Sequence, residues 1–528
     1  MSSYSAKNMG LLKFCVLFVF LSKCESSKIL FISPSLSNSV VMQAGRLADL
    51  LVQNGHNVTF VIPELSSKNQ HNGTKLAKVI RIGGIRDYWG EALEYYLSDT
   101  WINKLTPFYK MIVMAESQMM FCRDFLRKRN EWNHLKDEHF DVVLTNSLDF
   151  CDLGYAHYLE INAHIWLVTG ALHEFNYQVL GVHHPVSYIP TMEDNLKGTK
   201  MGIVERAHNM YMWFQAHLLR NYYYHRAQSV FRAEINPNFP DLHELGSKVA
   251  LTFVNDNEFL DFAGPTLNKI KFIGGAGLQQ PQKLDENWEV LMQKGKKGAI
   301  LVSFGTAFNP MFFPPETKKS LIRAFQHFSD YHFIFKAQKD DSVLVQLLEN
   351  TTNVDIVEWV PQSDILAHPR LRGFISHGGM NSVVETALRG VPVIVLPLFF
   401  DQLRNAKMVE YREIGLFLEP ENLSEKNLIE KIDRLLFDPK YQKGAKRLAK
   451  LIATSPNQPD KVFLDWTNFV IENGPLPELI PNSVNLNFFQ YYCIDILCIS
   501  CLIILAIFYL IFKLSTLIKN RNSKEKLE

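Results

Sequence analysis

Short apolar runs alternate with longer amphipathic stretches in the first part of this chain. Residues 28–34 form an apolar run closed by a proline, which is typical of a buried strand. Residues 40–53 place apolar side chains at helical spacing, and Gly55 follows them as a helix stop. Residues 57–63 form a second apolar run. This order of strand, helix and strand predicts a parallel sheet, because a crossover helix is how parallel strands are joined.

The same strand pattern returns further along, on both sides of two breaks at residues 262–266 and 272–277. The pattern is one of short apolar runs, several of which end in small residues. Before the breaks the runs are residues 140–144 and 164–168, and after them they are residues 299–304, 332–336, 354–359, 373–376 and 391–396. We therefore predict an α/β protein with two parallel sheets, arranged as two Rossmann-like domains that face each other across a cleft.

A stretch from about residue 192 to residue 232 has helical character and is rich in aromatic residues. The sequence leaves three places open for these side chains: the wall of an apolar pocket, a membrane-facing surface, or the core of the domain. The aromatic residues are Tyr211, Trp213, Phe214, Tyr222, Tyr223 and Tyr224.

Each end of the chain carries a further apolar segment. Residues 11–21 are preceded by Lys7 and followed by small residues, so we predict a signal peptide over residues 1–26. Residues 491–512 are long enough to cross a bilayer as a helix, because about 20 apolar residues suffice. The predicted span is followed by a basic tail, residues 513–528.

Basic residues lie on only one side of the predicted span. No lysine or arginine stands between residue 473 and the span, whereas the tail contains several. The positive-inside rule therefore predicts a single-pass protein with a cytosolic C-terminus and a luminal body. Lys524 and Lys526 resemble a dilysine signal for the endoplasmic reticulum, with an ordinary stop-transfer flank as the alternative. We expect the endoplasmic reticulum membrane as the location.

Composition and cysteine content narrow the function classes. The formal net charge is +1, so nothing indicates a nucleic acid partner. Of the seven cysteines only Cys122 and Cys151 lie in the expected globular part, where they could form one disulfide. So few cysteines exclude a disulfide framework and a cysteine-type zinc site. Four glycosylation sequons fit a luminal body, although we do not expect all to be used: Asn57, Asn72, Asn350 and Asn422.

The most informative segment runs from Trp359 to Gln402. Within it, His377–Gly379 lies between a predicted strand and a predicted helix. Two glycines allow backbone N–H groups to approach a ligand closely, and a helix N-terminus favours an anion, so this turn suits a diphosphate. His377 and Asn381 can donate further hydrogen bonds. Glu385, one turn beyond Asn381 on the same face, can accept hydrogen bonds from ribose hydroxyls.

Other residues in this segment suit a uracil and a sugar. Trp359 precedes a proline, so its ring can lie flat against a pyrimidine, and Gln362 has the donor and acceptor that a pyrimidine edge requires. Asp401 and Gln402 follow a strand end and can bind sugar hydroxyls. Ligands of open α/β sheets bind at the carboxyl ends of strands, which is where these residues lie. A turn of small residues at another strand end adds two further candidates, Ser303 and Thr306.

The spacing Trp-x-Pro-Gln, His-Gly-Gly-x-Asn, Glu and Asp-Gln over residues 359–402 resembles the UDP-glycosyltransferase signature. The resemblance covers nearly the whole chain and is closest in kind to the membrane-anchored animal UDP-glucuronosyltransferases. It implies the GT-B fold and the inverting, metal-independent and cofactor-independent transfer of glucuronic acid, or glucose, from a UDP-sugar to small lipophilic acceptors. Detoxification is the associated role, and association with itself or with family members stays open.

The resemblance also implies a division of the chain. Residues 27–265 would form the acceptor-binding domain, and residues 266–460 the domain that binds the UDP-sugar. Residues 461–490 would hold a return helix, from Phe463 to Asn473, and a luminal linker.

The resemblance fails at the catalytic base. Family members use a histidine in the N-terminal half, oriented by a carboxylate, to remove the acceptor's proton. Those two positions fall here on Val40 and Asn146, so no catalytic residue is assigned. Three interpretations remain open. In the first, the chain transfers sugar to acceptors that need no base, such as amines. In the second, it binds donor without turnover and regulates active relatives. In the third, another histidine acts as the base, the nearest candidates being His173, His183 and His184. We expect His56 to be structural.

Overall fold

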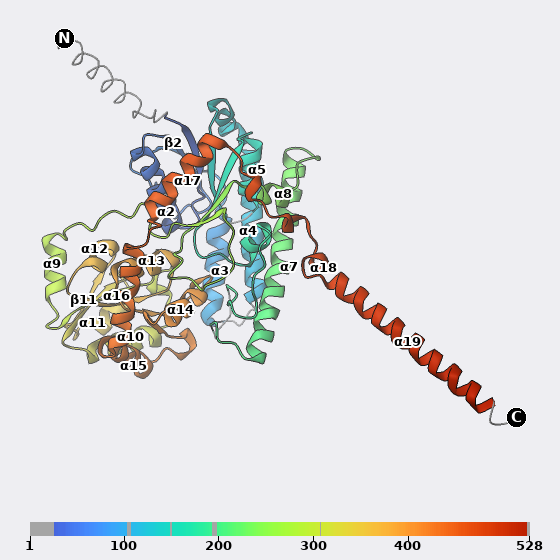
Figure 1. Ribbon diagram of the computed structural model, residues 1–528. Helices are drawn as coiled ribbons and strands as arrows, with labels where there is room; N and C mark the ends of the chain where they lie inside the picture. Colours follow the sequence, from blue (N-terminus) through green and yellow to red (C-terminus); the bar gives the residue numbers. More distant parts are fainter. Residues whose placement is uncertain (1–25, 103–106, 148–149, 193–197, 307, 525–528) are drawn as a thin grey trace, which may run out of the picture.

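The computed structural model describes residues 26–102, 107–147, 150–192, 198–306 and 308–524. The predicted signal peptide, apart from its last residue, lies outside the described residues, as does Lys526 of the dilysine pair. Two parallel sheets form the cores of two α/β halves, and one long helix extends away from them (Figure 1). The predicted fold class is confirmed.

The N-terminal half contains a seven-stranded sheet with the order β3-β2-β1-β4-β5-β6-β7. Every pair of neighbouring strands is parallel. The central strands are buried on both faces, which is why they read as continuous apolar runs in the sequence. The strands are β1 Lys28–Ile32, β2 Asn57–Pro63, β3 Lys78–Ile82, β4 Val142–Asn146, β5 Ala163–Val168, β6 Leu251–Val254 and β7 Ile270–Phe272.

Helices cover both faces of this sheet. The first of them begins after Ser37, whose hydroxyl accepts a hydrogen bond from the N–H of Val40. It buries the apolar stripe that the sequence predicted. The helices are α2 Asn38–Gln53, α3 Tyr88–Ile102, α4 Pro107–Arg127, α5 Cys151–Tyr158, α6 Glu174–Val179, α7 Ile203–Glu234 and α8 Leu242–Ser247.

The aromatic helix starts later than the sequence indicated. It was expected from about residue 192, but α7 begins at Ile203, after Gly198, whose φ of 65° favours a turn. The aromatic side chains of this helix lie in different surroundings, not in one of the three places that the sequence left open. Tyr223 lines the cavity described below, whereas Tyr211 and Phe214 are exposed.

The C-terminal half contains a six-stranded parallel sheet with the order β10-β9-β8-β11-β12-β13. Its strands are β8 Gly298–Ser303, β9 Tyr331–Lys336, β10 Val354–Val357, β11 Leu371–Ser376, β12 Val393–Val395 and β13 Gly415–Phe417. Its helices are α9 Glu286–Gln293, α10 Pro315–His327, α11 Ser342–Leu348, α12 Gln362–Ala367, α13 Met380–Arg389, α14 Gln402–Tyr411, α15 Glu425–Phe437 and α16 Pro439–Ala453.

The N-terminal sheet extends past residue 265, where the sequence placed the end of the first domain. The short edge strand β7 pairs with β6, so the glycine and proline at 264 and 265 form a loop inside the first half. Helix α17, Pro459–Asn473, then crosses back to this half and packs against α2 and β7. The ring of Phe463 lies 5.0 Å from that of Phe253 on β6.

The C-terminal apolar helix α19, Ile494–Lys524, lies outside the globular body (Figure 1). An 18-residue stretch within its segment 494–520 has a mean hydropathy of 2.8, and the length and composition of the segment suffice for a membrane span. The predicted span began at residue 491, but residues 488–491 form a separate turn of helix, α18. Cys493, with a φ of 53°, separates the two helices.

Cys122 of α4 and Cys151 of α5 form a disulfide, as their isolation in the globular part suggested. Persistent disulfides are typical of oxidising compartments, so this bond is consistent with a luminal body.

Candidate functional site

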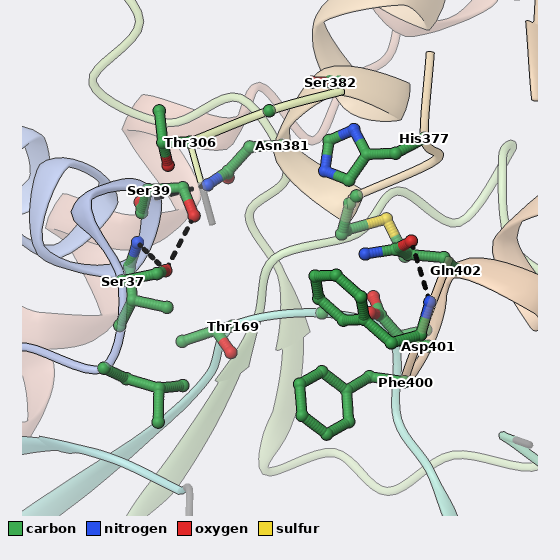
Figure 2. A pocket seen from close by; sticks show the side chains of 18 of the residues that line it. Ser37, Ser39, Thr169, Thr306, His377, Asn381, Ser382, Phe400, Asp401 and Gln402 are labelled. Atoms are coloured by element: carbon green, nitrogen blue, oxygen red, sulfur yellow. Dashed lines mark hydrogen bonds between the residues drawn. The ribbon is translucent and has the colours of Figure 1, made fainter. Parts of the chain in front are cut away.

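A large cavity lies between the two halves, at the carboxyl ends of the strands of both sheets. Its volume is about 560 Å³. Figure 2 shows side chains from both halves around it. All nine residues that the sequence selected for a sugar-nucleotide site line this cavity: Ser303, Thr306, Trp359, Gln362, His377, Asn381, Glu385, Asp401 and Gln402.

The turn after β11 has the geometry that a close approach to a ligand requires. Gly378 has a φ of 85°, and a Cβ there would lie 2.4 Å from Val395, so a larger residue is excluded. Gly305 has a φ of 83°, and its missing side chain leaves room for the ring of His377. Burial, helped by the charge of Lys336, lowers the pKa of His377 to about 4. The imidazole is therefore neutral at physiological pH and can donate one ring N–H.

Two residues on the first turns of α13 reach the N-terminal half. The side-chain amide of Asn381 donates to the carbonyl of Ser39 at 3.1 Å, and its oxygen accepts from Asn255 at 2.8 Å. Figure 2 shows Asn381 and Ser39 meeting at the edge of the cavity. Glu385 accepts a hydrogen bond from Gln362 and lies 3.9 Å from Arg46 of α2. Burial raises the pKa of Glu385, and Arg46 opposes that shift.

Trp359 lines the cavity and is 55% exposed as a residue. The ammonium of Lys336 lies 5.1 Å from the centre of the indole ring and donates to the carbonyl of Gly305 at 2.8 Å. Lys336 also lines the cavity, although sequence reasoning did not select it. Its position as the last residue of β9 was the signal that could have found it, since strand ends carry the other site residues.

Asp401 and Gln402 lie at the start of α14. The side-chain oxygen of Gln402 accepts from the N–H groups of Leu398 and Phe399, which leaves its amide N–H groups for the cavity. The carboxylate of Asp401 accepts a hydrogen bond from Asn405 at 2.7 Å, and burial raises its pKa. Both side chains are therefore held in fixed orientations.

The N-terminal half contributes a mainly apolar wall to the cavity. The apolar side chains come from α2, α3, α4, α6 and α7 and from the end of β5. They include Val40, Met42, Trp89, Leu93, Met111, Met114, Val168, Phe175, Leu219 and Tyr223. Apolar walls with a few polar groups are typical of sites for small lipophilic molecules.

The two positions where the resemblance led us to expect a base and its carboxylate hold no such pair. Val40 lines the cavity as an apolar residue. Asn146 is buried at the end of β4 and lines a separate void of about 20 Å³. Neither polar atom of its side chain has a hydrogen-bond partner among the described residues. Gln118 borders both this void and the cavity.

Of the three alternative histidines, only His173 lines the cavity. Burial lowers its pKa to about 4, which makes it a weak base at neutral pH. His184 is buried 3.8 Å from Glu174, and His183 contacts Tyr492 just before the apolar helix. His56 bonds to Asn468 of α17 at 2.9 Å, away from the cavity lining, in keeping with a structural role.

Comparison with known proteins places the chain among sugar transferases. The family described as "UDP-glucoronosyl and UDP-glucosyl transferase" matches residues 27–526. The chain is 31% identical over 496 residues, covering 93% of it and 95% of the relative, to a Caenorhabditis elegans protein named "Putative UDP-glucuronosyltransferase ugt-50". It is 28% identical to human UDP-glucuronosyltransferase 3A2, over 89% of this chain and 90% of that one.

Solved structures share the fold. The glycosyltransferase of kitacinnamycin superposes with a TM-score of 0.58 at 17% identity, covering 84% of this chain and 99% of that one. The calicheamicin glycosyltransferase CalG4 gives 0.54 at 18% identity, covering 85% and 100%. These GT-B neighbours confirm the arrangement of two facing Rossmann-like halves.

Proposed function

Because this chain belongs to the UDP-glucoronosyl and UDP-glucosyl transferase family and is a glycosyltransferase of that family, we propose that its central cavity binds a UDP-sugar and a small lipophilic acceptor together. The sugar is glucuronic acid or glucose, and it passes to the acceptor with inversion and without a metal. One observation carries the proposal: eight polar residues and Trp359, spread over 100 positions of sequence, line one cavity whose other wall is mainly apolar.

The donor lies along the carboxyl ends of the C-terminal strands. The uracil stacks on Trp359, whose exposed ring is available for it. The diphosphate lies at the turn after β11, where backbone N–H groups and neutral His377 donate hydrogen bonds. Glu385 accepts from the ribose, and Asp401 and Gln402 bind the sugar hydroxyls from the start of α14.

The transfer step needs little proton chemistry from this chain. An acceptor atom attacks the anomeric carbon, the bond from that carbon to the UDP oxygen breaks, and its electron pair leaves with UDP. The N–H groups around the diphosphate stabilise the charge that develops on the leaving group. Since Val40 cannot take a proton, acceptors such as amines are favoured over neutral phenols and alcohols. An amine attacks with a lone pair that is already available, and the ammonium formed loses its proton to water after UDP has left.

Val40 and Asn146 also support a second function. With Val40 and Asn146 at the positions of the base and its carboxylate, the chain would bind donor without turnover and regulate active family members. This alternative predicts donor binding with no conjugate formed, together with altered kinetics of a co-expressed relative.

The proposed location is the endoplasmic reticulum membrane, with the two halves in the lumen. The apolar helix α19 spans the bilayer and the basic tail lies in the cytosol. The disulfide between Cys122 and Cys151 supports an oxidising environment for the body.

Thermal denaturation of the purified full-length chain, with UDP, UDP-glucuronic acid, UDP-glucose or ADP added, tests the donor site. A ligand at 100 times its dissociation constant adds about 2.7 kcal/mol of stability, so the uridine compounds should raise the melting temperature and ADP should not. His377→Ala should reduce that rise. If uridine nucleotides leave the melting temperature unchanged, the proposed function is wrong.

A panel of amines and phenols, incubated with each donor in the same preparation, then tests turnover. Conjugates with amines support the transferase, whereas donor binding without any conjugate supports the regulatory alternative.

A further inference from the structure

The outer face of α7 exposes an apolar stripe. Its large apolar side chains are between 44% and 78% exposed, whereas Met212 and Tyr223 are buried on the opposite face. Among the side chains that the structure describes, no other helix before α18 exposes more than two large apolar residues. The stripe consists of Ile203, Val204, Met210, Tyr211, Phe214 and Leu218.

The spacing of these residues places them on one face. They recur at intervals of three, four and seven positions, which is the repeat of a helix surface. Apolar residues therefore lie on two opposite faces of α7, one packed into the body and one directed outward. A folded chain rarely exposes a continuous apolar stripe unless another surface covers it.

The polar residues around the stripe suit a lipid headgroup layer. Between positions 205 and 234, α7 contains no aspartate or glutamate, so lipid phosphates meet no like charge from this helix. Arg206 is exposed, and its long side chain can place the guanidinium among the headgroups. Tyrosine, as at position 211, is typical of membrane interfaces. These features favour a helix that lies in the plane of the interface.

The segment that leads into α19 is attached to a loop that also contacts α7. The hydroxyl of Tyr492 lies 2.9 Å from a ring nitrogen of His183. Further along the same loop, the carbonyl of Val186 accepts a hydrogen bond from the side-chain amide of Asn209 on α7 at 2.7 Å. Figure 1 shows α7 on the side of the body from which α19 leaves. The stripe is therefore close to the bilayer that α19 is proposed to span.

We propose that this stripe is a membrane-docking surface, which lies in the interfacial layer of the luminal leaflet while α19 spans the same bilayer. The apolar side chains enter the boundary between headgroups and acyl chains, and Arg206 contacts the phosphates. The inference goes beyond the proposed function, because it rests on the proposed membrane location and is independent of the donor site. The body is then held against the membrane at two places, α7 and the start of α19.

Photolabelling of the full-length chain in phosphatidylcholine vesicles tests the docking surface. The vesicles contain a phosphatidylcholine with a photoreactive group on the part of the acyl chain nearest the headgroup, and mass spectrometry locates the labelled peptides. Peptides from α19 and from residues 203–218 should both be labelled. The peptide of α11 around Val345, which is exposed on the C-terminal half, should not be labelled.

Variants isolate the contribution of the stripe. Met210→Asp with Phe214→Asp should reduce the labelling of α7 roughly 10-fold or more, because two large apolar side chains can no longer be buried in lipid. Labelling of α19 should not change. Met210→Leu with Phe214→Leu keeps the stripe apolar and should be labelled as the wild type is.

Val345→Asp is the matched control, since it places the same charge at an exposed apolar position of the other half. It should leave the labelling of α7 and α19 unchanged. All of these variants change exposed side chains outside the cavity lining, so UDP should stabilise them as it stabilises the wild type.

Labelling of α19 without labelling of α7 would overturn the docking surface, and so would unchanged labelling of α7 in the double aspartate variant. If a chemical crosslinker joins α7 of one copy to α7 of another while lipid labels neither, the stripe is a protein interface and the proposal is wrong. If α19 is also unlabelled, the proposed membrane span is wrong as well. Stabilisation by UDP, measured on the same samples, reports on the donor site separately.

Discussion

The side-chain amide of Asn381 donates a hydrogen bond to the backbone carbonyl of Ser39, 3.1 Å away in the other half of the molecule. The start of α13 in the C-terminal half thus contacts the start of α2 in the N-terminal half. The pair formed by Arg46 and Glu385 adds a second contact between the same two helices. Residues proposed to bind the nucleotide also join the two halves, so donor binding and domain closure should be coupled.

His377 should contribute to donor affinity through a neutral imidazole. His377→Ala should weaken UDP binding roughly 10- to 100-fold, because a hydrogen bond to a charged phosphate is lost. Isothermal titration with UDP measures the change. His327→Gln, at an exposed position at the end of α10, is the control and should bind UDP as the wild type does. Equal affinities in the wild type and the alanine variant would contradict this role.

Restoring the missing pair should create activity towards phenols. The double variant Val40→His with Asn146→Asp should conjugate phenols about 100-fold faster than the wild type, or more, as expected for a positioned general base. Product formation with UDP-glucuronic acid and UDP-glucose measures it. Asn146→Asp alone should lower the melting temperature, because it places a carboxylate at a buried position whose present side chain has no hydrogen-bond partner among the described residues.

A double variant that binds UDP normally and still forms no phenol conjugate would show that the geometry around Val40 does not suit a base. The single substitution Val40→His is the control for the imidazole alone.

The disulfide should stabilise the N-terminal half. Cys122 and Cys151 are 29 positions apart, and closing a loop of that length contributes about 3–4 kcal/mol by the chain-entropy estimate. Cys122→Ser with Cys151→Ser should therefore melt at a lower temperature, and added reductant should lower the wild type to a similar value. Cys498→Ser, at an exposed free cysteine, should not change the melting temperature. Identical melting temperatures of the wild type, the double cysteine variant and Cys498→Ser would contradict the prediction.

Acid should destabilise the fold through buried histidines. Burial lowers the pKa of His184 to about 3, whereas it is about 6.5 in the unfolded chain. The unfolded state therefore binds more protons between these values. The free energy of unfolding falls as pH decreases through that window, by about 1.4 kcal/mol per pH unit for one such group. Above pH 6.5 this penalty is absent.

Melting temperatures measured from pH 7.5 to pH 4.5 test this expectation. His184→Asn should show a shallower loss of stability with acid than the wild type, while the exposed His327→Gln should follow the wild type. Parallel curves for all three proteins would exclude His184 as a contributor.

The sequence could select residues that line the C-terminal side of the cavity, because that side follows a simple physical rule. Buried parallel strands are continuous apolar runs, and cavity-lining residues follow their carboxyl ends, as His377 and Asp401 do. Gly378 was also informative, because a glycine after a predicted strand indicates a turn, and the backbone there has a positive φ.

The residues on the N-terminal side of the cavity could not be selected in this way. Arg220, which lines the cavity, lies inside a long helix whose apolar and polar residues show no single face, so nothing in the spacing separates it from exposed Arg226. The edge strand β7 has only three residues, too few for a pattern, and the domain boundary was placed before it as a result. Contacts between the halves, such as that of Arg46, depend on tertiary packing.

Helix α17 also determines how the two halves can move. The polypeptide passes between them twice, once between β7 and α9 and again between α16 and α17. The N–H of Gly277, in the first connecting segment, donates a hydrogen bond to Asp460 at the start of α17, so the two connecting segments are joined. A pair of adjacent connections allows rotation about one axis and resists sliding or twisting. Entry of a substrate should therefore need only a hinge-like swing that widens the far edge.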